Sequence, residues 1–233
     1  MNTLPVAPAR RYFFRFNTRD VALGCQATPL HTTKRDLAAI LAPVVEETRA
    51  DGAFVYRASE DSDEFRAIAA RTMATPKIPE LGVTLGTEAT LLLSRGIEPF
   101  QTSHSSDERF SNLPETLQFG IRRVLVFPLR AADSLLGFLT LGRVDTEPFS
   151  DHEIQTALPV ARVVAAVLER DALQVALRER KLVERAKGLI QKRRRVSEED
   201  AYMILRNESR RSRRPMAELA EEVINEALLR KTA

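Results

Sequence analysis

The chain has 233 residues and a mass of 26.2 kDa, which suits one large domain or two small ones. Hydrophobic residues make up 44% of it and charged residues 29%, a balance typical of a chain that buries a core. Trp is absent, so we expect that core to be mainly aliphatic. The single cysteine, Cys25, excludes an internal disulfide and a Cys-rich zinc site, and the three histidines are widely separated. We therefore expect neither a metal nor a cofactor.

The sequence contains no segment typical of a membrane or secreted protein. No apolar run approaches the ~18 residues that a membrane helix needs. The first residues, MNTLPVAPARRYFFRF, contain no apolar stretch of signal-peptide length. The catalytic and phosphate-binding motifs G-x-x-x-x-G-K-[ST], H-E-x-x-H and G-x-S-x-G are also missing. These observations predict a cytoplasmic protein that is not an enzyme.

Charge and turn residues divide the chain near residue 170. Residues 1–169 carry 18 Lys and Arg against 21 Asp and Glu, whereas residues 170–233 carry 17 against 11. Eight of the nine glycines precede residue 143, so the first part is rich in turns and the second part favours helix. We therefore predict an N-terminal extension over 1–30, a mixed domain over 31–168 and a basic helical domain over 170–233.

The first domain is predicted to hold a helix, two strands, an irregular middle, two strands and a helix. Apolar residues at helical spacing follow Asp36, and Asp51-Gly52 ends that helix. The strand candidates are AFVYRAS, FRAIAAR, RRVLVFPLR and SLLGFLTLGRV, and the middle segment GVTLGTEATLLLSRG is predicted to hold a strand, a glycine turn and a short helix. Ser150 with Glu153 three residues later predicts a capping box that begins the last helix. This order describes an α+β domain with one antiparallel sheet and helices packed against it.

A long helix is predicted to connect the domains over residues 154–189, and Pro159 is expected to kink it or to restrict its first turns. Its apolar residues recur at steps of three and four, a heptad pattern that favours a parallel homodimer through a coiled coil. The alternative is a single long helix packed on its own domain. The predicted dimer seam consists of Ile154, Leu158, Ala161, Ala165, Leu168, Ala172, Val175 and Leu182.

Three helices are predicted in the second domain. Ser197 is the expected N-cap of the middle helix, and Pro215 suits the first turn of the last one. Arginines cluster before the first turn and around the second, and we expect them to meet in one positive patch that binds phosphate. Gly188 is unfavourable inside a helix, which predicts close approach of an RNA backbone or of another helix.

The first domain resembles a GAF domain. The resemblance lies in DGAFVYRASEDSDEFRAIAA, in GVTLGTEATLLLSRGIEPF and above all in IRRVLVFPLRAADSLLGFLTLGRVDTEPFSDHEI. It implies a sensory module that either holds a small-molecule ligand or only dimerises. The ligand, its binding residues and the signal stay open at this point.

The second domain resembles the ANTAR domain, the RNA-binding module of bacterial transcription antiterminators. The matching residues are Ala186-Lys187-Gly188, the acidic helix start after Ser197, Leu205-Arg206 and Leu219-Ala220; Arg213 stands where the family usually has Asn. The resemblance and the charge together predict RNA binding by Lys187, Gly188, Arg193, Arg194, Arg195, Arg206, Arg210, Arg211, Arg213 and Arg214.

The sequence as a whole predicts a GAF sensor that controls ANTAR binding to hairpins in mRNA leaders and so favours antitermination. Two alternatives remain. In the first, the last two helices form a helix-turn-helix that binds DNA. In the second, the GAF domain only dimerises, and the basic bundle docks a protein partner.

Overall fold

The computed structural model describes residues 34–59, 64–72, 82–103, 108–110, 113–132 and 134–232. The predicted N-terminal extension, with Cys25, and the residues His31 and His104 lie outside the described residues. Within these ranges no helix is both long and apolar enough to span a membrane.

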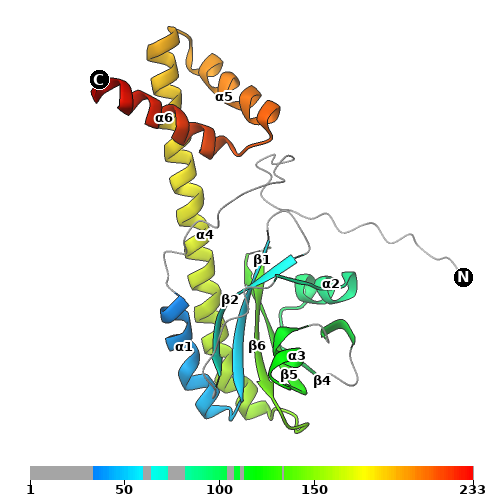
Figure 1. The fold of residues 1–233 in the computed structure, drawn as a ribbon. Helices are drawn as coiled ribbons and strands as arrows, with labels where there is room; N and C mark the ends of the chain where they lie inside the picture. The colour runs from blue at the N-terminus through cyan, green and yellow to red at the C-terminus, as the bar shows by residue number, and fades with distance from the viewer. Residues whose placement is uncertain are drawn as a thin grey trace, which may run out of the picture.

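A six-stranded antiparallel sheet forms the centre of the first domain, with the strand order β3-β2-β1-β6-β5-β4 (Figure 1). Each strand pairs with a neighbour that runs the opposite way, as the predicted α+β architecture requires. The strands are β1 (Gly52–Ala58), β2 (Glu64–Thr72), β3 (Gly82–Thr84), β4 (Phe100–Ser103), β5 (Arg123–Ala131) and β6 (Ser134–Arg143). Of these, β4 was missed by the sequence analysis.

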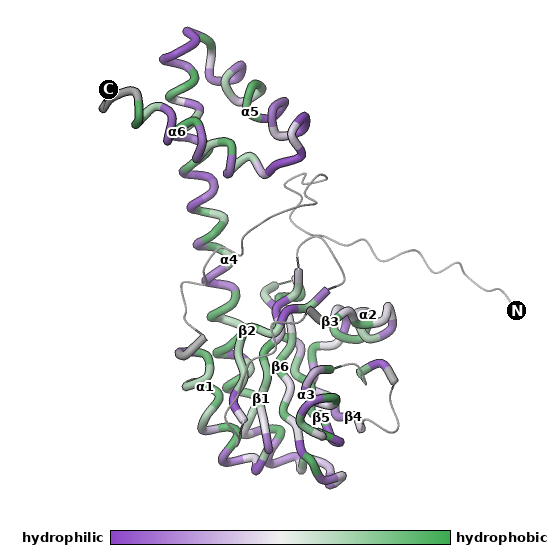
Figure 2. The backbone as a smooth tube through the Cα atoms, in the orientation of Figure 1, coloured by the Kyte–Doolittle hydropathy of each residue, from purple (hydrophilic) through white to green (hydrophobic). Residues whose placement is uncertain are grey.

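Helices cover both faces of this sheet (Figure 1). One face packs against α1 (Lys34–Glu47) and the first turns of the long helix α4 (Asp151–Arg194). The other face carries an aromatic core beneath α2 (Thr87–Arg95), the short 3₁₀ helix η1 (Glu108–Phe110) and α3 (Pro114–Gln118). The hydropathy colouring shows apolar residues concentrated in the strands and in alternating stretches along α4 (Figure 2).

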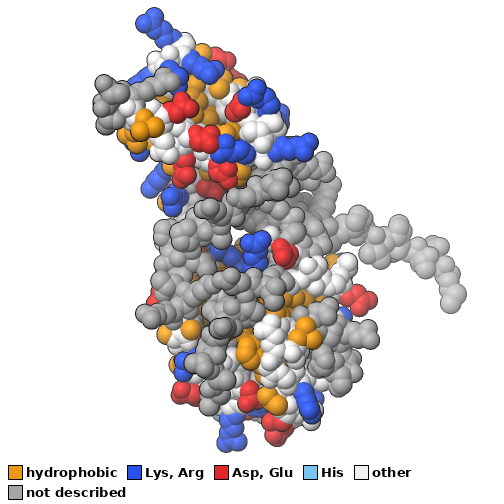
Figure 3. All heavy atoms as spheres, in the orientation of Figure 1, with side chains coloured by type: hydrophobic (Ala, Val, Ile, Leu, Met, Phe, Trp, Pro, Cys, Tyr) orange, Lys and Arg blue, Asp and Glu red, His pale blue; other side chains and the backbone are white. Residues whose placement is uncertain are grey.

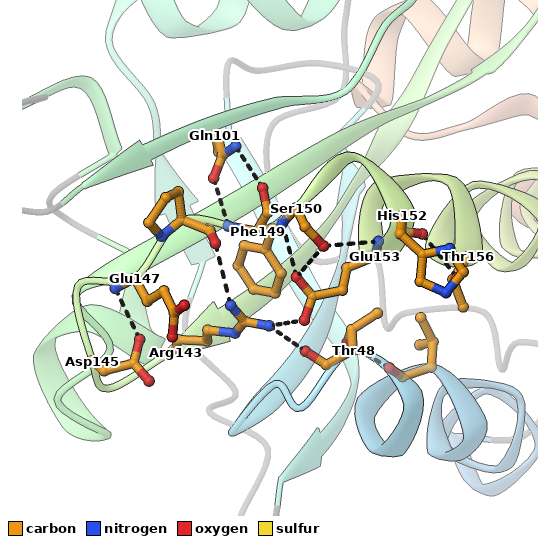
Figure 4. Close-up of polar contacts among 12 residues, drawn as sticks. Thr48, Gln101, Arg143, Asp145, Glu147, Phe149, Ser150, His152, Glu153 and Thr156 are labelled. Carbon is orange, nitrogen blue, oxygen red and sulfur yellow. Dashed lines mark hydrogen bonds and ion pairs between the residues drawn. The ribbon is translucent and has the colours of Figure 1, made fainter.

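The N-terminus of α4 is fixed to the sheet by Arg143, the last residue of β6 (Figure 4). Its guanidinium group donates to the backbone oxygen of Thr48 at 2.5 Å, forms an ion pair with Glu153, and lies 4.1 Å from the ring centre of Phe149. Glu153 also completes the predicted capping box with Ser150, which is confirmed. One buried arginine thus joins the end of α1, the sheet and the start of α4.

The second domain is a three-helix bundle that uses the end of α4 as its first helix. It adds α5 (Glu198–Ser212) and α6 (Met216–Thr232). Ser197 accepts a hydrogen bond from the backbone of Asp200 and so caps α5 as predicted. The core is small and consists of Ala186, Ile190, Ala201, Leu205, Leu219, Ala220 and Ile224.

A carboxyl group is buried in the aromatic side of the first domain. Glu115, on α3, is fully buried and accepts hydrogen bonds from the hydroxyl groups of Tyr56 and Thr140, the second at 2.5 Å. Burial raises the pKa of Glu115 above its ordinary value of 4.5, although the two hydroxyl donors partly oppose that shift. Burial and the nearby Glu115 carboxyl also raise the pKa of Tyr56.

We expect this carboxyl to make the stability of the protein depend on pH. Because its pKa is raised on folding, the stability it contributes is present below the ordinary value and is lost as the pH rises through the raised pKa. Glu115→Gln keeps an oxygen for Tyr56 and places an amide donor near Thr140. Thermal unfolding at pH values from about 4.5 to 8 should show the wild type losing stability relative to Glu115→Gln. The exposed Glu98→Gln is the control, and equal slopes for all three proteins would contradict the prediction.

Candidate nucleic-acid interface

The outer face of α4 lies opposite the face that packs on the two domains. Helical residues turn by 100° each, so Ala161 and Leu168 in the first core lie on the same side as Ala186 and Ile190 in the second. α4 runs through Pro159 without interruption. One continuous helix therefore serves both domains and leaves a single long face uncovered.

The residues of the predicted dimer seam mostly contact the chain's own domains. Ala161 and Leu168 are buried in the first core, and Ile154, Leu158 and Ala165 pack against it. Leu182 packs against the core of the second domain. Only Ala172 and Val175 lie between the two cores, and both are half-buried. The heptad pattern is thus used within one chain, as in the alternative of a helix packed on its own domain.

A different row of α4 residues is exposed. Val163, Leu173 and Leu177 are 49%, 64% and 53% exposed, and with Ala166 they follow steps of three, seven and four, with Arg170 at the position that is skipped. Ala166, Leu173 and Leu177 line a shallow hollow of about 300 Å³. The sequence does not reveal this row, because the buried row on the opposite side of α4 has a more regular spacing and more apolar residues.

The predicted arginines form two groups rather than one patch. Arg193, Arg194 and Arg195 lie at the end of α4, whereas Arg210 and its neighbours lie at the end of α5. With 15 residues, α5 separates the groups by about 22 Å. Figure 3 shows Lys and Arg side chains spread over the second domain among acidic ones. An anion that contacts both groups must therefore be long.

Four of the predicted binding residues are paired with acidic side chains of the same chain. Arg193 contacts Glu226 at 3.3 Å, and Arg211 contacts Glu208 at 2.9 Å. Arg214 binds both Glu218 and Glu222, which raises the pKa of its guanidinium group. The side chains in these pairs are more than a third exposed, so water and salt screen each pair and phosphate can readily replace the carboxylate.

Lys187 is the fourth predicted binding residue that is paired with acidic side chains, and it joins α4 to α5. Its side chain is only 10% exposed, and its ammonium nitrogen lies 2.7 Å from Glu198, at the start of α5, and 2.9 Å from Glu184. The hydrogen bonds from Lys187 lower the pKa of Glu198, and the bonds to Glu198 and Glu184 raise the pKa of Lys187. Lys187 therefore holds the turn between α4 and α5 and has little surface left for RNA.

Arg195 and Arg213 have a backbone conformation that favours glycine. Each follows the last turn of a helix, with φ of 54° in the left-handed region, and each donates its backbone N–H to the preceding turn. Both side chains are exposed and, among the residues that the structure describes, make no ion pair. The same holds for Arg194 and Arg210, whereas Arg206 is half-buried and likewise makes no ion pair with a described residue. These five arginines are the free cations of the predicted set.

The face of the sheet beneath α2 and α3 is filled by the protein's own side chains. Tyr56, Phe54 and Phe138 are fully buried there, and Tyr56 stacks on Phe138 with ring centres 4.6 Å apart. A shallow hollow of about 190 Å³ opens beside Phe54 and Phe119 at the end of this core. In the described ranges no group of three or more His, Cys, Asp and Glu residues is placed to hold a metal ion.

Comparison with known families agrees with both resemblances. The model of the GAF domain matches residues 34–168, and that of the ANTAR domain matches residues 171–224. The first match covers more than half of the chain, so the chain belongs to the GAF domain family. An ANTAR domain follows the GAF domain directly. The chain is thus a sensor domain joined to a module of the RNA-binding antitermination type, and neither domain is of a catalytic kind.

Solved structures agree on the fold of the first domain. The GAF domain of a phosphoenolpyruvate-protein phosphotransferase from Coxiella burnetii superposes with a TM-score of 0.53 at 18% identity, covering 65% of this chain and 89% of that one. A phycocyanobilin-bound GAF domain of a cyanobacterial phytochrome gives 0.51 at 16% identity, with 60% and 86% covered. At such identities the likeness concerns the fold alone. No curated protein matches the chain.

The left-handed backbone conformation at Arg213 leads to a prediction about stability. Arg213→Gly should be more stable than Arg213→Ala by about 1 kcal/mol, because both remove the charge and only glycine relieves the backbone. Arg210 lies inside α5, so there the order should reverse by about 1 kcal/mol in favour of alanine. Chemical unfolding of the four variants measures both differences. The same order at both positions would contradict the prediction.

Proposed function

We propose that this protein is a signal-responsive transcription antitermination regulator, in which the GAF domain controls the binding of the ANTAR domain to hairpin loops in nascent mRNA. The observation that carries the proposal is the ANTAR bundle, in which five arginines of the predicted set form no ion pair with a described residue, built on the same helix that begins in the GAF domain. A signal at the GAF domain reaches the bundle through α4. A tenfold change in RNA affinity needs about 1.4 kcal/mol of coupling.

The surface of the bundle suits structured RNA better than extended single strands. Arginine guanidinium groups bind phosphate through two parallel hydrogen bonds and stack on splayed bases. Among the residues described in the bundle, Tyr202 is the one aromatic side chain, so it lacks the row of stacking rings typical of single-strand binders. We therefore favour hairpins, recognised by shape and charge.

Binding to an RNA with two tandem hairpins, measured over a salt series, tests the proposal. If about six phosphates are contacted, log K should fall with log salt at a slope of about −4, or roughly two orders of magnitude between about 50 and 200 mM. Scrambled loops and a DNA duplex are the competing ligands. Loop-dependent binding is expected for the wild type. It should weaken at least about tenfold in Arg210→Glu with Arg211→Glu, because two contacts then become repulsive.

Each other outcome of this experiment contradicts the proposal in a recognisable way. Equal binding to hairpin RNA and duplex DNA would favour the DNA-binding alternative. Binding to neither at low salt, with and without candidate GAF ligands, would favour an acidic protein partner. Exchange of Arg71 and Arg122, exposed arginines of the first domain, to Glu is the matched control and should leave loop preference unchanged.

We also propose that two copies of the chain associate through the exposed row of α4. Val163, Ala166, Leu173 and Leu177 lie on one face with heptad spacing that Arg170 interrupts once, and all four are exposed. In such a dimer, binding of one ANTAR bundle to the first hairpin would hold the other bundle close to the second hairpin, at a high effective concentration. The small-molecule ligand, if the GAF domain takes one, would act on this pair.

Exchanging Leu173 and Leu177 to Glu should convert the dimer to a monomer, because two charges then enter each half of the seam. Analytical ultracentrifugation gives the mass directly. The variant should also lose the advantage of tandem over single hairpins while binding a single hairpin as before. Ile97 and Leu117 are exposed apolar residues of the first domain, and their exchange to Glu is the control. A monomeric wild type would contradict the dimer without affecting RNA binding.

A further inference from the structure

The outer face of α4 changes character along its length. Up to Leu177 it is the apolar row described above, and beyond it the same face becomes basic. Lys181, Arg185, Lys192 and Arg195 follow one another with Gly188 in the middle, at steps of four, three, four and three. We call these five residues the basic stripe. It lies opposite the face by which Ala186 and Ile190 enter the bundle core.

Gly188 leaves an open notch in this stripe. A Cβ atom built on Gly188 meets no heavy atom within 4 Å, so neither α5 nor α6 needs the space. Glycine inside a helix is unfavourable compared with alanine. Of the two explanations considered from the sequence, packing of another helix of this chain is therefore excluded. Close approach from outside the chain remains.

The charged side chains of the stripe are also accessible from solvent. The side chains of Lys181, Arg185 and Lys192 are exposed and, in the described part of the chain, form no ion pair. Glu184 lies next to the stripe, and its carboxylate is bound to Lys187. In this part of α4, Lys187 thus joins two helices, whereas Lys181, Arg185 and Lys192 face solvent.

We infer that the basic stripe holds the phosphate backbone of the RNA, with Gly188 as the point of closest approach. This inference rests on the proposed RNA-binding function and extends it to Lys181, Arg185 and Lys192, which lie outside the predicted set. From Lys181 to Arg195 the stripe is about 21 Å long, enough for several successive phosphates. Phosphate contacts position a nucleic acid without reading its sequence. The stripe therefore sets affinity and salt dependence and leaves loop preference to other residues.

Neutralising the stripe gives the first test, on the full chain with the tandem-hairpin RNA. Exchange of Lys181, Arg185 and Lys192 to Gln should lower affinity at least about tenfold at about 50 mM salt and make the salt slope shallower by about 2. The ratio of affinities for intact and scrambled loops should not change. Exchange of Arg71, Arg95 and Arg122 to Gln removes the same charge from exposed positions in the GAF domain and is the matched control.

Filling the notch gives the second test, which does not change charge. Gly188→Leu should raise the melting temperature, because leucine favours helix, yet lower RNA affinity at least about tenfold. Gly188→Ala should raise the melting temperature as well and change affinity by less than about threefold, because one methyl group obstructs little. A loss of affinity together with a gain of stability is not expected from a purely structural role.

The outcomes distinguish a failure of this inference from a failure of the proposed RNA-binding function. No loop-dependent binding by the wild type would overturn both. If the wild type shows loop-dependent binding and the stripe variant binds no more weakly than its control, the role of the stripe is overturned and the proposed function stands. The same follows if Gly188→Leu binds hairpin loops as well as the wild type does. A change of oligomeric mass in Gly188→Leu would assign the notch to a second copy of the chain and would likewise overturn the role of the stripe.

Discussion

The structure depends on one hydrophobic face that runs along a single uninterrupted helix. α4 contributes Ala157 and Val164 to the core of the GAF domain and, further along the same face, Ala186 and Ile190 to the core of the ANTAR bundle. Neither domain is complete without it. The helix is fixed at its base by Arg143 and Glu153, whose ion pair is nearly buried, and Lys187 secures the turn by which the bundle folds back on it.

This arrangement explains which features of the fold follow from the sequence. Local signals were reliable: the capping box at Ser150 and the N-cap at Ser197 are confirmed, and so is the order of the predicted helices and strands, although β4 and α3 were missed. The heptad spacing correctly indicates a long helix with one apolar face, but periods of 3.5 and 3.6 residues hardly differ over five turns. Spacing alone therefore cannot tell whether that face meets a second chain or the chain's own sheet.

The candidate site was predictable only in part, because charge in a sequence does not reveal pairing. Arg193, Arg194 and Arg195 are equivalent by type, yet the first contacts Glu226 and the third is strained and free. The separation of the two arginine groups by the length of α5 was also not predictable, because residues close in the sequence can lie at opposite ends of a helix. Glu115 gave no signal at all, since a lone carboxyl in PETLQ looks like an ordinary surface residue. Its burial follows only from the way α3 lies on the sheet.

The geometry of α4 has a mechanical consequence. With 44 residues the helix is about 66 Å long, and between Leu168 and Leu182 it leaves one domain core before it enters the other. A tilt of about 10° at Leu168 therefore moves Ile190, about 33 Å farther along, by about 6 Å. Leu168 is the pivot of this motion, and the bundle is the part that moves. A small bend at the edge of the GAF core is thus amplified into a displacement of the bundle about as large as one helical turn.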